Sequence, residues 1–438
     1  MDHIGRLIWN YYKFRYLSHF KSRRQLAEWQ NAKIQNFIKR IIPQSEFYRK
    51  HYVGLNIEDW RDFPTIDKQM MMDHFDQLNT GNIKKNEAFH VAFKAEESRD
   101  FSSQVGKFTV GLSSGTSGNR GLFVASPQER AIWAGAILAK TLPNGFLCSE
   151  QIAFFLRANS NLYQTIHSRK IKFKFFDLLT DLDQHIDELQ VFCPTILVAP
   201  PSVLRILAEK VAEGRLQIAP KKIISVAEVL EPLDAEYIKS QFKQTIHQIY
   251  QCTEGFLAAT CTYGTLHINE DIVCVQREDI DQTSKRFIPV ITDFTRTTQP
   301  IIRYRLNDIL VEKNDCPCGS PFMAIASIEG RTDDVFYVRA KNKAGFVTVF
   351  PDFIRREIIM TSSCISEYKV DQLDPENIVI YLGFKRNSPE EEIKLQLVEN
   401  FRILFEKMYS ITPRITFTNK LYKNGAHKLR RVERKFKR

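Results

Sequence analysis

The hydrophobic residues recur with two different periods along the chain, and together these periods predict an α/β protein. Between residues 127 and 250, short apolar runs alternate with stretches of helical spacing: IAFFL, IKFKFFDLL, TILVAP before SVLRILAEKVAEG, and KIISVA before DAEYIKSQF. This alternation is typical of βα units and of a mainly parallel sheet. We also expect a helix from Pro127 to Leu142 and a strand-rich section over residues 262–330.

The pattern resets after Arg331, where we place a domain boundary. A strand, a helix, a strand, a long helix and a strand follow in DVFYV, DFIRREIIM, NIVIYLGF, SPEEEIKLQLVENFRILFEKM and PRITFT. A chain of 438 residues is long enough for two or three domains. We therefore predict a large domain over residues 1–330 and a small α+β domain over residues 331–438.

Residues 1–42 repeat apolar and aromatic side chains among basic ones, and Pro43 ends the pattern. This arrangement predicts one or two amphipathic helices. Two interpretations stay open, namely a helix packed on the main body and a helix attached to a membrane surface. In the next polar and methionine-rich stretch, TIDKQMMMDHF, we expect Thr65 to cap a short helix.

The composition is that of an ordinary globular protein. Apolar residues make up 43% and charged residues 26% of the chain, which excludes disordered and fibrous classes. No apolar run approaches the ~20 residues needed for a transmembrane segment, and the first residues lack a signal-peptide pattern. We therefore expect an unprocessed cytoplasmic protein. The eight cysteines lie mostly among apolar residues, which favours free thiols over disulfides.

The net charge of +11 is concentrated at the two ends of the chain. Residues 1–40 carry +7 and residues 421–438 carry +7, which leaves −3 for the rest. A nucleic-acid groove needs basic residues spread over one face, so we expect no nucleic-acid partner and only local contacts with anions.

A loop rich in serine and glycine, GLSSGTSGNRG, lies between two strand-like runs over residues 111–121. Gly111, Ser113 and Gly115 fit the nucleophile elbow of serine hydrolases, but that motif needs a helix directly after the serine, and we expect a strand here. The small residues and hydroxyl groups favour a phosphate-binding loop instead. The Gly-Lys-Ser/Thr sequence of a Walker loop is absent.

Four further stretches carry residues suited to nucleotide chemistry. YQCTEG at 250–255 places a hydroxyl beside a carboxylate, a pair suited to a phosphate oxygen and Mg²⁺. RYRLND at 303–308 ends in an aspartate, and IEGRTDD at 328–334 puts an arginine and two acids at the expected domain boundary. NGAHKLRRVERK at 424–435 presents Lys428 after a glycine.

Taken together and in this order, these stretches resemble the adenylate-forming (acyl-AMP) ligases, and within them the phenylacetate-CoA ligase-like branch. The resemblance covers nearly the whole chain, from SEFYRKHY and FPTIDKQMMMDHF through SSGTSG, AEVLEP, YQCTEG, PIIRYRLND, CPCG and EGRTDD to the lysine near the end. It implies a large domain with mixed sheets and flanking helices, and a small mobile C-terminal domain. The sequence departs from the family at Asn119-Arg120, Gln251, Asn307 and His427, where relatives often have lysine or glycine.

The resemblance also implies roles for individual residues. Thr253 would contact the α-phosphate, Glu254 would hold Mg²⁺, and Lys428, or Lys423 in its place, would be the catalytic lysine. Asp333 would be the hinge of the small domain. The ATP-binding residues would be Ser113, Ser114, Gly115, Thr116, Ser117 and Gly118 at the β- and γ-phosphates, Ala227, Glu228 and Tyr250 around the adenine, and Asp308 and Arg331 at the ribose or phosphates.

Four residues offer the ligands of a structural zinc site. Cys261, His267, Cys316 and Cys318 have the number and type of donor atoms that a closed tetrahedral site needs. Several members of the resembled branch are similar here. The other cysteines, at 148, 193, 252, 274 and 364, are interpreted as thiols of the core or as chance occurrences.

The polar cluster FLRANSNLY at 155–163 stands in an apolar setting. Arg157 or Asn159 would pair with a polar group of the substrate, or the cluster would serve only hydrogen bonding within a loop.

We therefore predict an ATP-dependent, AMP-forming ligase. It would activate a carboxylic acid, aromatic or otherwise unsaturated by analogy with the branch, as the acyl-adenylate, and would transfer it to the thiol of CoA or of a carrier-protein phosphopantetheine arm. Two alternatives stay open: a serine hydrolase using Ser113, and a non-enzymatic zinc protein whose basic ends bind nucleic acid or an acidic partner. A homodimer is also left open.

Overall fold

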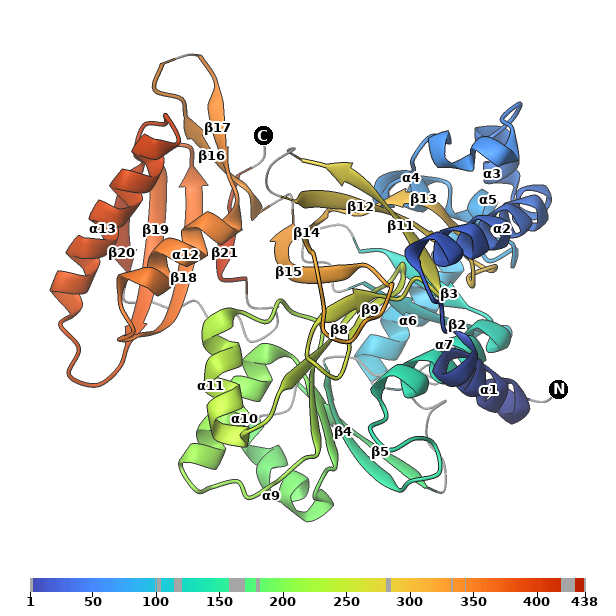
Figure 1. The fold of residues 1–438 in the computed structure, drawn as a ribbon, viewed down its shortest axis with the longest axis horizontal. Coiled ribbons are helices and arrows are strands. Elements are labelled where there is room, and N and C mark those ends of the chain that lie inside the picture. The colour runs from blue at the N-terminus through green and yellow to red at the C-terminus, as the bar shows by residue number, and fades with distance from the viewer. Residues whose placement is uncertain are drawn as a thin grey trace. The chain divides into compact units, whose positions relative to one another are not determined.

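A computed structural model of the protein defines its fold (Figure 1). Among the described residues, no helix is long and apolar enough to cross a membrane. The residues that the structure describes are 3–98, 100, 104–113, 120–156, 170–178, 182–280, 285–331, 334–342, 344–418 and 430–436.

The chain divides into two compact units. The first consists of Met1–Leu306 and Val311–Ala326, and the second of Asn307–Leu310 and Ser327–Arg438. The main boundary between the units therefore lies between residues 326 and 327. The sequence pattern predicted it between residues 330 and 331.

The first unit contains a parallel sheet half built from βα units, as the alternating pattern predicted. Its strands pair in parallel in the spatial order β5-β4-β6-β7-β8. Leu204, Leu207 and Ile238 of the covering helices are fully buried against these strands. The elements are β4 (Glu150–Leu156), β5 (Ile171–Asp177), α9 (Leu182–Phe192), β6 (Ile196–Ala199), α10 (Pro201–Ala212), β7 (Lys222–Ser225), α11 (Pro232–Phe242) and β8 (Ile246–Cys252).

Strand β8 joins this half to an antiparallel half of the same sheet. It forms a hairpin with β9 in which Cys252 faces Gly255, so Thr253 and Glu254 are the two residues of the turn. The sheet then continues in the order β9-β10-β15-β14-β12-β11, and β13 also pairs with β12. These strands are β9 (Gly255–Thr260), β10 (Leu266–Ile268), β11 (Val273–Asp279), β12 (Arg286–Asp293), β13 (Ile301–Arg305), β14 (Asp308–Lys313) and β15 (Ala324–Arg331).

A small sheet precedes the parallel half. Strands β2 and β3 form an antiparallel hairpin around the serine- and glycine-rich loop, and β1 pairs with β2. Its members are β1 (Gln104–Val105), β2 (Phe108–Leu112) and β3 (Leu122–Ala125). The helix predicted to follow is α7 (Pro127–Thr141).

The N-terminal part of the chain is helical, and its long helix ends at Ile41, two residues before Pro43, as predicted. The short helix that Thr65 was expected to cap begins instead at Lys68, because the Asp67 side chain accepts a hydrogen bond from the Met70 N–H at 2.8 Å. The helices are α1 (His3–Tyr12), the π-helix η1 (Lys13–Leu17), α2 (Arg23–Ile41), η2 (Ile42–Gln44), α3 (Glu46–His51), η3 (Ile57–Asp62), α4 (Lys68–Asp73), α5 (Phe75–Leu78) and α6 (Lys85–Ser98).

The second unit is an α+β fold with a four-stranded sheet in the order β20-β19-β18-β21. The buried side chains of Leu397, Phe401 and Phe405 form the inner face of its long helix α13. Its elements are β16 (Phe336–Arg339), β17 (Phe346–Val349), α12 (Pro351–Thr361), β18 (Ile365–Asp374), β19 (Asn377–Phe384), α13 (Glu390–Lys407), β20 (Arg414–Thr418) and β21 (Val432–Arg434).

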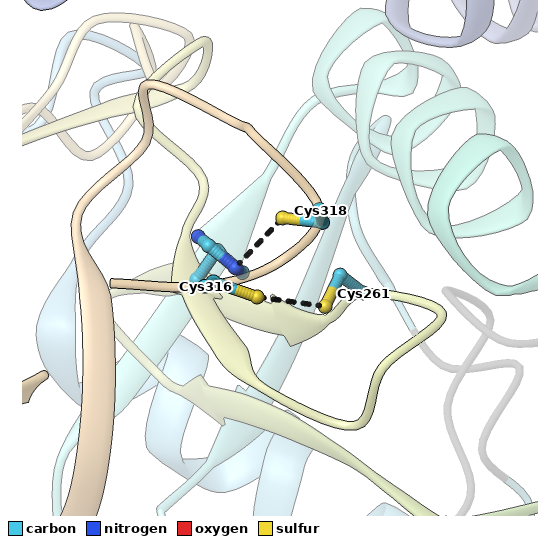
Figure 2. Close-up of side chains that lie close together, drawn as sticks. Cys261, Cys316 and Cys318 are labelled. Atoms are coloured by element: carbon cyan, nitrogen blue, oxygen red, sulfur yellow. Dashed lines mark hydrogen bonds between the residues drawn. The ribbon is translucent and has the colours of Figure 1, made fainter.

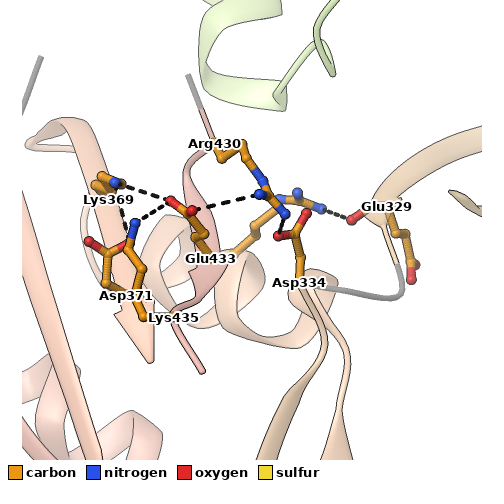
Figure 3. A network of polar contacts seen from close by, with 8 residues as sticks. Glu329, Asp334, Lys369, Asp371, Arg430, Glu433 and Lys435 are labelled. Carbon is orange, nitrogen blue, oxygen red and sulfur yellow. Dashed lines mark hydrogen bonds and ion pairs between the residues drawn. The ribbon is translucent and has the colours of Figure 1, made fainter. Parts of the chain in front are cut away.

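A network of charged side chains connects the two ends of the second unit (Figure 3). Arg430, just before β21, pairs with the buried Asp334 and lies 3.6 Å from Glu433. Glu433 in turn accepts a hydrogen bond from Lys369 of β18 at 3.4 Å. The segment that follows the boundary is thus bound to the last strand of the chain.

Candidate functional site

The turn between β8 and β9 places the hydroxyl of the half-buried Thr253 beside the buried carboxylate of Glu254. Thr253 Oγ1 donates a hydrogen bond to Glu254 Oε2 at 2.9 Å, and the Tyr304 hydroxyl donates to Glu254 Oε1 at 2.8 Å. Burial, together with the neighbouring Glu254 carboxylate, raises the pKa of Tyr304 far above its usual range, so its phenol remains a donor. Glu254 is only 7% exposed, and both of its oxygens are therefore held in place.

The backbone of this turn is fixed by Arg296, which the sequence analysis did not single out. Its guanidinium donates to the Thr253 carbonyl, to the Val124 carbonyl at 3.3 Å and to Gln299 Oε1 at 3.1 Å. The arginine thus connects the turn to the hairpin strand β3. The only local signal was a basic residue inside the polar run TDFTRTTQ, which does not reveal a partner more than 40 residues away.

A second carboxylate lies close to the same turn. Asp293 is buried at the end of β12, and its Oδ1 accepts hydrogen bonds from the Thr295 N–H at 2.8 Å and the Thr295 hydroxyl at 2.6 Å. A Cβ atom added at Gly255 would lie 3.0 Å from Asp293 Oδ2, so the chain approaches this carboxylate closely. Burial raises the pKa of Asp293 to about 6, although Thr295 and the Arg296 charge lower it in part.

Ser113 lies where strand β2 leads into the serine- and glycine-rich loop. Its hydroxyl accepts hydrogen bonds from the Gly121 N–H at 2.7 Å and from Lys68 Nζ at 3.4 Å, and its own N–H donates to the Gly121 carbonyl at 2.8 Å. The two ends of the loop are therefore hydrogen-bonded to each other. Lys68 lies beside them, a cationic residue that the sequence motifs did not indicate. The rest of the expected phosphate loop, Ser114, Gly115, Thr116, Ser117 and Gly118, lies outside the described residues.

The residues expected around the adenine follow or lie on neighbouring parallel strands. Ala227 comes two residues after β7 and has a φ of 68°, a left-handed conformation that is rare for alanine. Glu228 Oε2 accepts a hydrogen bond from the Ser202 N–H of α10 at 3.3 Å. Tyr250 is buried on the adjacent strand β8. The carboxyl ends of β6, β7 and β8 therefore lie side by side, which is where ligands bind in open α/β sheets.

Not all of the predicted residues are described by the structure. Asp308 begins β14, in the second unit. Arg331 ends β15, and its side chain is not among the described parts. The other predicted positions that lie outside the described residues are Arg157, Asn159, Asp333, Lys423 and Lys428.

The four predicted zinc ligands lie together in the first unit (Figure 2). Their donor atoms are all within 4.8 Å of one another. Cys261 Sγ lies 3.6 Å from Cys316 Sγ, and Cys318 Sγ lies 3.4 Å from His267 Nε2. Tetrahedral bonds of about 2.3 Å to sulfur and about 2.0 Å to nitrogen place neighbouring donors roughly 3.5–3.8 Å apart. The donor set therefore fits a Zn²⁺ ion.

The surroundings of the cluster also suit a metal. His267 Nδ1 lies 3.0 Å from the Phe322 carbonyl oxygen, an arrangement that leaves Nε2 available as a ligand. Burial raises the pKa of Cys316, but hydrogen bonds from Thr265 and from the Cys318 backbone outweigh it and lower the value to about 6, whereas burial and the neighbouring thiols raise the pKa of Cys318 to about 11. A thiolate is the form that binds metal.

The remaining five cysteines are free thiols, and only part of them belongs to the core. Cys274 is buried, whereas Cys148 and Cys193 are exposed. Cys148 lies in the loop after α7, and Cys193 directly follows α9. The apolar residues beside them in the sequence gave no sign of this exposure.

Comparison with known proteins identifies the fold. No protein-family model matches the sequence. Protein CapK of Staphylococcus aureus is 26% identical over 229 residues, which cover 51% of this chain and 49% of that protein. The match thus spans about half the length of this curated relative.

Solved structures align over more of the chain. A 2-hydroxyisobutyryl-CoA ligase in the postadenylation state with 2-HIB-AMP has a TM-score of 0.67 at 17% identity, and the alignment covers 92% of this chain and 88% of that one. The GH3.15 acyl acid amido synthetase has a TM-score of 0.57 at 13% identity, with coverages of 88% and 84%. The anthranilate CoA ligase AuaEII has a TM-score of 0.52 at 14% identity, with coverages of 73% and 66%. The chain therefore has the fold of the adenylate-forming ligases, which confirms the predicted fold class.

Proposed function

We propose that the protein is an ATP-dependent, AMP-forming ligase that activates a carboxylic acid as its acyl-adenylate. The observation that carries this proposal is the Thr253-Glu254 turn, which presents a fixed hydroxyl and carboxylate at the carboxyl edge of the parallel strands. The fold that surrounds the turn is shared with ligases whose structures contain acyl-AMP. The position and the chemistry of the turn together support nucleotide binding.

Glu254 suits Mg²⁺ because this ion prefers hard oxygen ligands and is usually held by one or two carboxylates plus substrate phosphates. Among the described residues, each Glu254 oxygen has one hydrogen-bond donor, which leaves lone pairs for a cation. When bound, Mg²⁺ would neutralise charge on the phosphates as pyrophosphate leaves. Tyr304 and Arg296 would keep the carboxylate and the turn in place, and Thr253 would meet the α-phosphate.

The other roles follow the family resemblance. The loop that starts at Ser113 would bind the β- and γ-phosphates, with Lys68 beside its first residue. Ala227, Glu228 and Tyr250 would border the adenine, and Asp308 and Arg331 would bind the ribose or the phosphates. Asp333 would be the hinge, and Lys428 would stabilise the charge that develops between the carboxylate and the α-phosphate.

The finer features of the reaction concern the acid and the acceptor. We propose an aromatic or otherwise unsaturated acid, and the thiol of CoA or of a phosphopantetheine arm as acceptor. The solved structures with this fold include acid-CoA ligases and also amide synthetases. The acceptor test should therefore include an amine beside the two thiols.

The decisive measurement is ATP–pyrophosphate exchange with a panel of carboxylic acids. The parent should exchange with at least one acid, and Glu254→Gln should lower that rate by about 100-fold or more, because it removes a group that stabilises the charge of the transition state. Glu278→Gln is the matched control, since Glu278 pairs with Arg305 on the exposed surface. A parent that is inactive with every acid, or a Glu254→Gln variant that equals the parent, would overturn the proposal.

We also propose that Cys261, His267, Cys316 and Cys318 hold a structural Zn²⁺ ion. When bound, the ion would join the turn after β9, strand β10 and the loop before β15. It would contribute folding free energy rather than chemistry, because four protein ligands leave no open position for a substrate.

A further inference from the structure

Helix α1 and the π-helix η1 are anchored to the first unit by one side only. Leu7, Tyr11 and Phe14 are buried in a cluster that includes Ala134 and Leu138 of α7. Figure 1 shows α1 running beside α7. Helices α1 and α7 approach so closely that a Cβ atom added at Gly135 of α7 would lie 2.6 Å from the Asn10 Cβ atom of α1. The segment is therefore a fixed part of the unit.

The other side of this segment exposes large apolar side chains. Trp9 is 52% exposed and contacts Tyr12 with ring centroids 6.4 Å apart, and Tyr12 contacts Tyr16 at 5.3 Å. At about 100° per residue, the α1 members of this set lie within one arc of about 140°. We call this set the α1 apolar face; it consists of Ile4, Ile8, Trp9, Tyr12, Tyr16 and Leu17, which are 44% to 66% exposed.

The charges around the α1 apolar face have one sign. Residues 3–27 contain six lysines and arginines and no acid, and residues 130–149, which include most of α7 and the loop after it, also contain no acid. Of the carboxylates next to these stretches in sequence or by contact, Glu129, Glu150, Glu270 and Asp271 are buried, and the exposed Glu28 pairs with Arg24. On the helical wheel, Arg6 and Lys13 follow directly after Trp9, at the edge of the apolar arc.

We propose that the α1 apolar face binds the surface of a bilayer that contains anionic lipids. Tryptophan and tyrosine favour the boundary between headgroups and acyl chains. A helix with an apolar face and a cationic edge lies in the plane of this boundary, and its binding increases with apolar area and with anionic lipid. The absence of carboxylates from residues 3–27 and 130–149, together with their lysines and arginines, matches a negatively charged surface. This proposal does not depend on the proposed catalytic function.

Sedimentation with phosphatidylcholine vesicles, with and without phosphatidylserine, tests the proposal on the full chain. The parent should bind the vesicles that contain phosphatidylserine, and added salt should weaken this binding. The variant Ile8→Ser/Trp9→Ser/Tyr12→Ser should bind at least about tenfold more weakly, because it removes half of the apolar face. It keeps the buried Leu7, Tyr11 and Phe14, so its melting curve should stay close to that of the parent.

Two further variants separate the apolar and the electrostatic contributions. Arg6→Glu/Lys21→Glu should lose binding to anionic vesicles while keeping its fold. Val191→Ser/Met360→Ser/Leu395→Ser should bind like the parent, because these residues are 72% to 87% exposed but lie far from α1 in the sequence. Absence of parent binding to phosphatidylserine vesicles would overturn the proposal. A parent dimer that Ile8→Ser/Trp9→Ser/Tyr12→Ser converts to monomers, without any lipid binding, would assign the face to a second copy instead.

Discussion

Asp293 illustrates how a single buried residue can work against the stability of the chain that contains it. Its carboxyl is enclosed at the end of β12, beside the turn that carries Glu254. Two hydrogen bonds from Thr295 do not compensate for the lost hydration, so burial raises the pKa to about 6. A group with this environment favours its protonated form in the folded state.

The raised pKa predicts a pH-dependent effect of Asp293→Asn. The unfolded pKa is about 3.9, so the stabilisation that Asp293 gives below about pH 4 is lost as pH rises through about 6. Asparagine does not titrate and keeps the Oδ1 acceptor. Relative to the parent, the free energy of unfolding of Asp293→Asn should therefore rise by roughly 1–3 kcal/mol between about pH 4 and pH 7. Urea unfolding of both proteins across this range measures it, and a constant difference would contradict it.

At the same scale, the sequence predicted the site only in part. Thr253 and Glu254 could be predicted because a hydroxyl beside a carboxylate after a strand is a local feature. Arg296, Tyr304 and Lys68 could not, because each acts on a residue more than 40 positions away. Their positions depend on the pairing of the sheet, which no short motif encodes.

The elements were more predictable than their ends. The alternation of apolar runs predicted the strands and helices of the parallel half, since each buried strand and each amphipathic helix has its own period. The cap of α4 was wrong by two residues, because Thr65 and Asp67 are both capable caps and only the observed hydrogen bond selects Asp67. In the second unit, strands β17, β18 and β21 were missed: β21 has only three residues, too few to show a period, and β18 carries polar residues among its buried ones.

Helix α7 offers a prediction that concerns how one element is attached to another. Glu129 is 7% exposed and accepts hydrogen bonds from the Ser126 N–H at 2.6 Å and the Thr298 N–H at 2.7 Å. The same carboxylate therefore caps its own helix and holds the turn that contains Arg296. Glu129→Ala would leave several buried donors without partners, each costing about 1–3 kcal/mol.

We expect Glu129→Ala to lower the free energy of unfolding of the first unit by about 3–5 kcal/mol. Urea unfolding followed by tryptophan fluorescence measures this change. Glu28→Ala is the control: Glu28 is exposed and pairs with Arg24 one helical turn away, so its loss should cost at most about 0.5 kcal/mol. A decrease in the free energy of unfolding below about 1 kcal/mol for Glu129→Ala would contradict this prediction. It would show that water molecules accept the hydrogen bonds that the carboxylate accepts in the parent.

At the scale of the whole molecule, the two units differ in what stabilises them. All four cysteine and histidine ligands belong to the first unit, although two of them follow His267 by about 50 residues. The second unit relies on its own sheet and on the charged network around Arg430 and Glu433. A bound zinc ion should therefore stabilise one unit and leave the other unchanged.

The tryptophans make this difference measurable. All four, at positions 9, 29, 60 and 133, lie in the first unit, so their fluorescence follows that unit alone. The purified parent should contain about one zinc ion per chain. A strong chelator should lower the urea midpoint of the fluorescence transition and leave the remaining circular-dichroism transition, that of the second unit, in place.

Cys318→Ser should behave like the chelated parent, because three ligands hold the ion more weakly than four. Cys148→Ser is the matched control, since this thiol is exposed and lies outside the cluster. If chelation moves neither transition, or if it moves both equally, zinc does not stabilise the first unit specifically, and the four ligands would need another role.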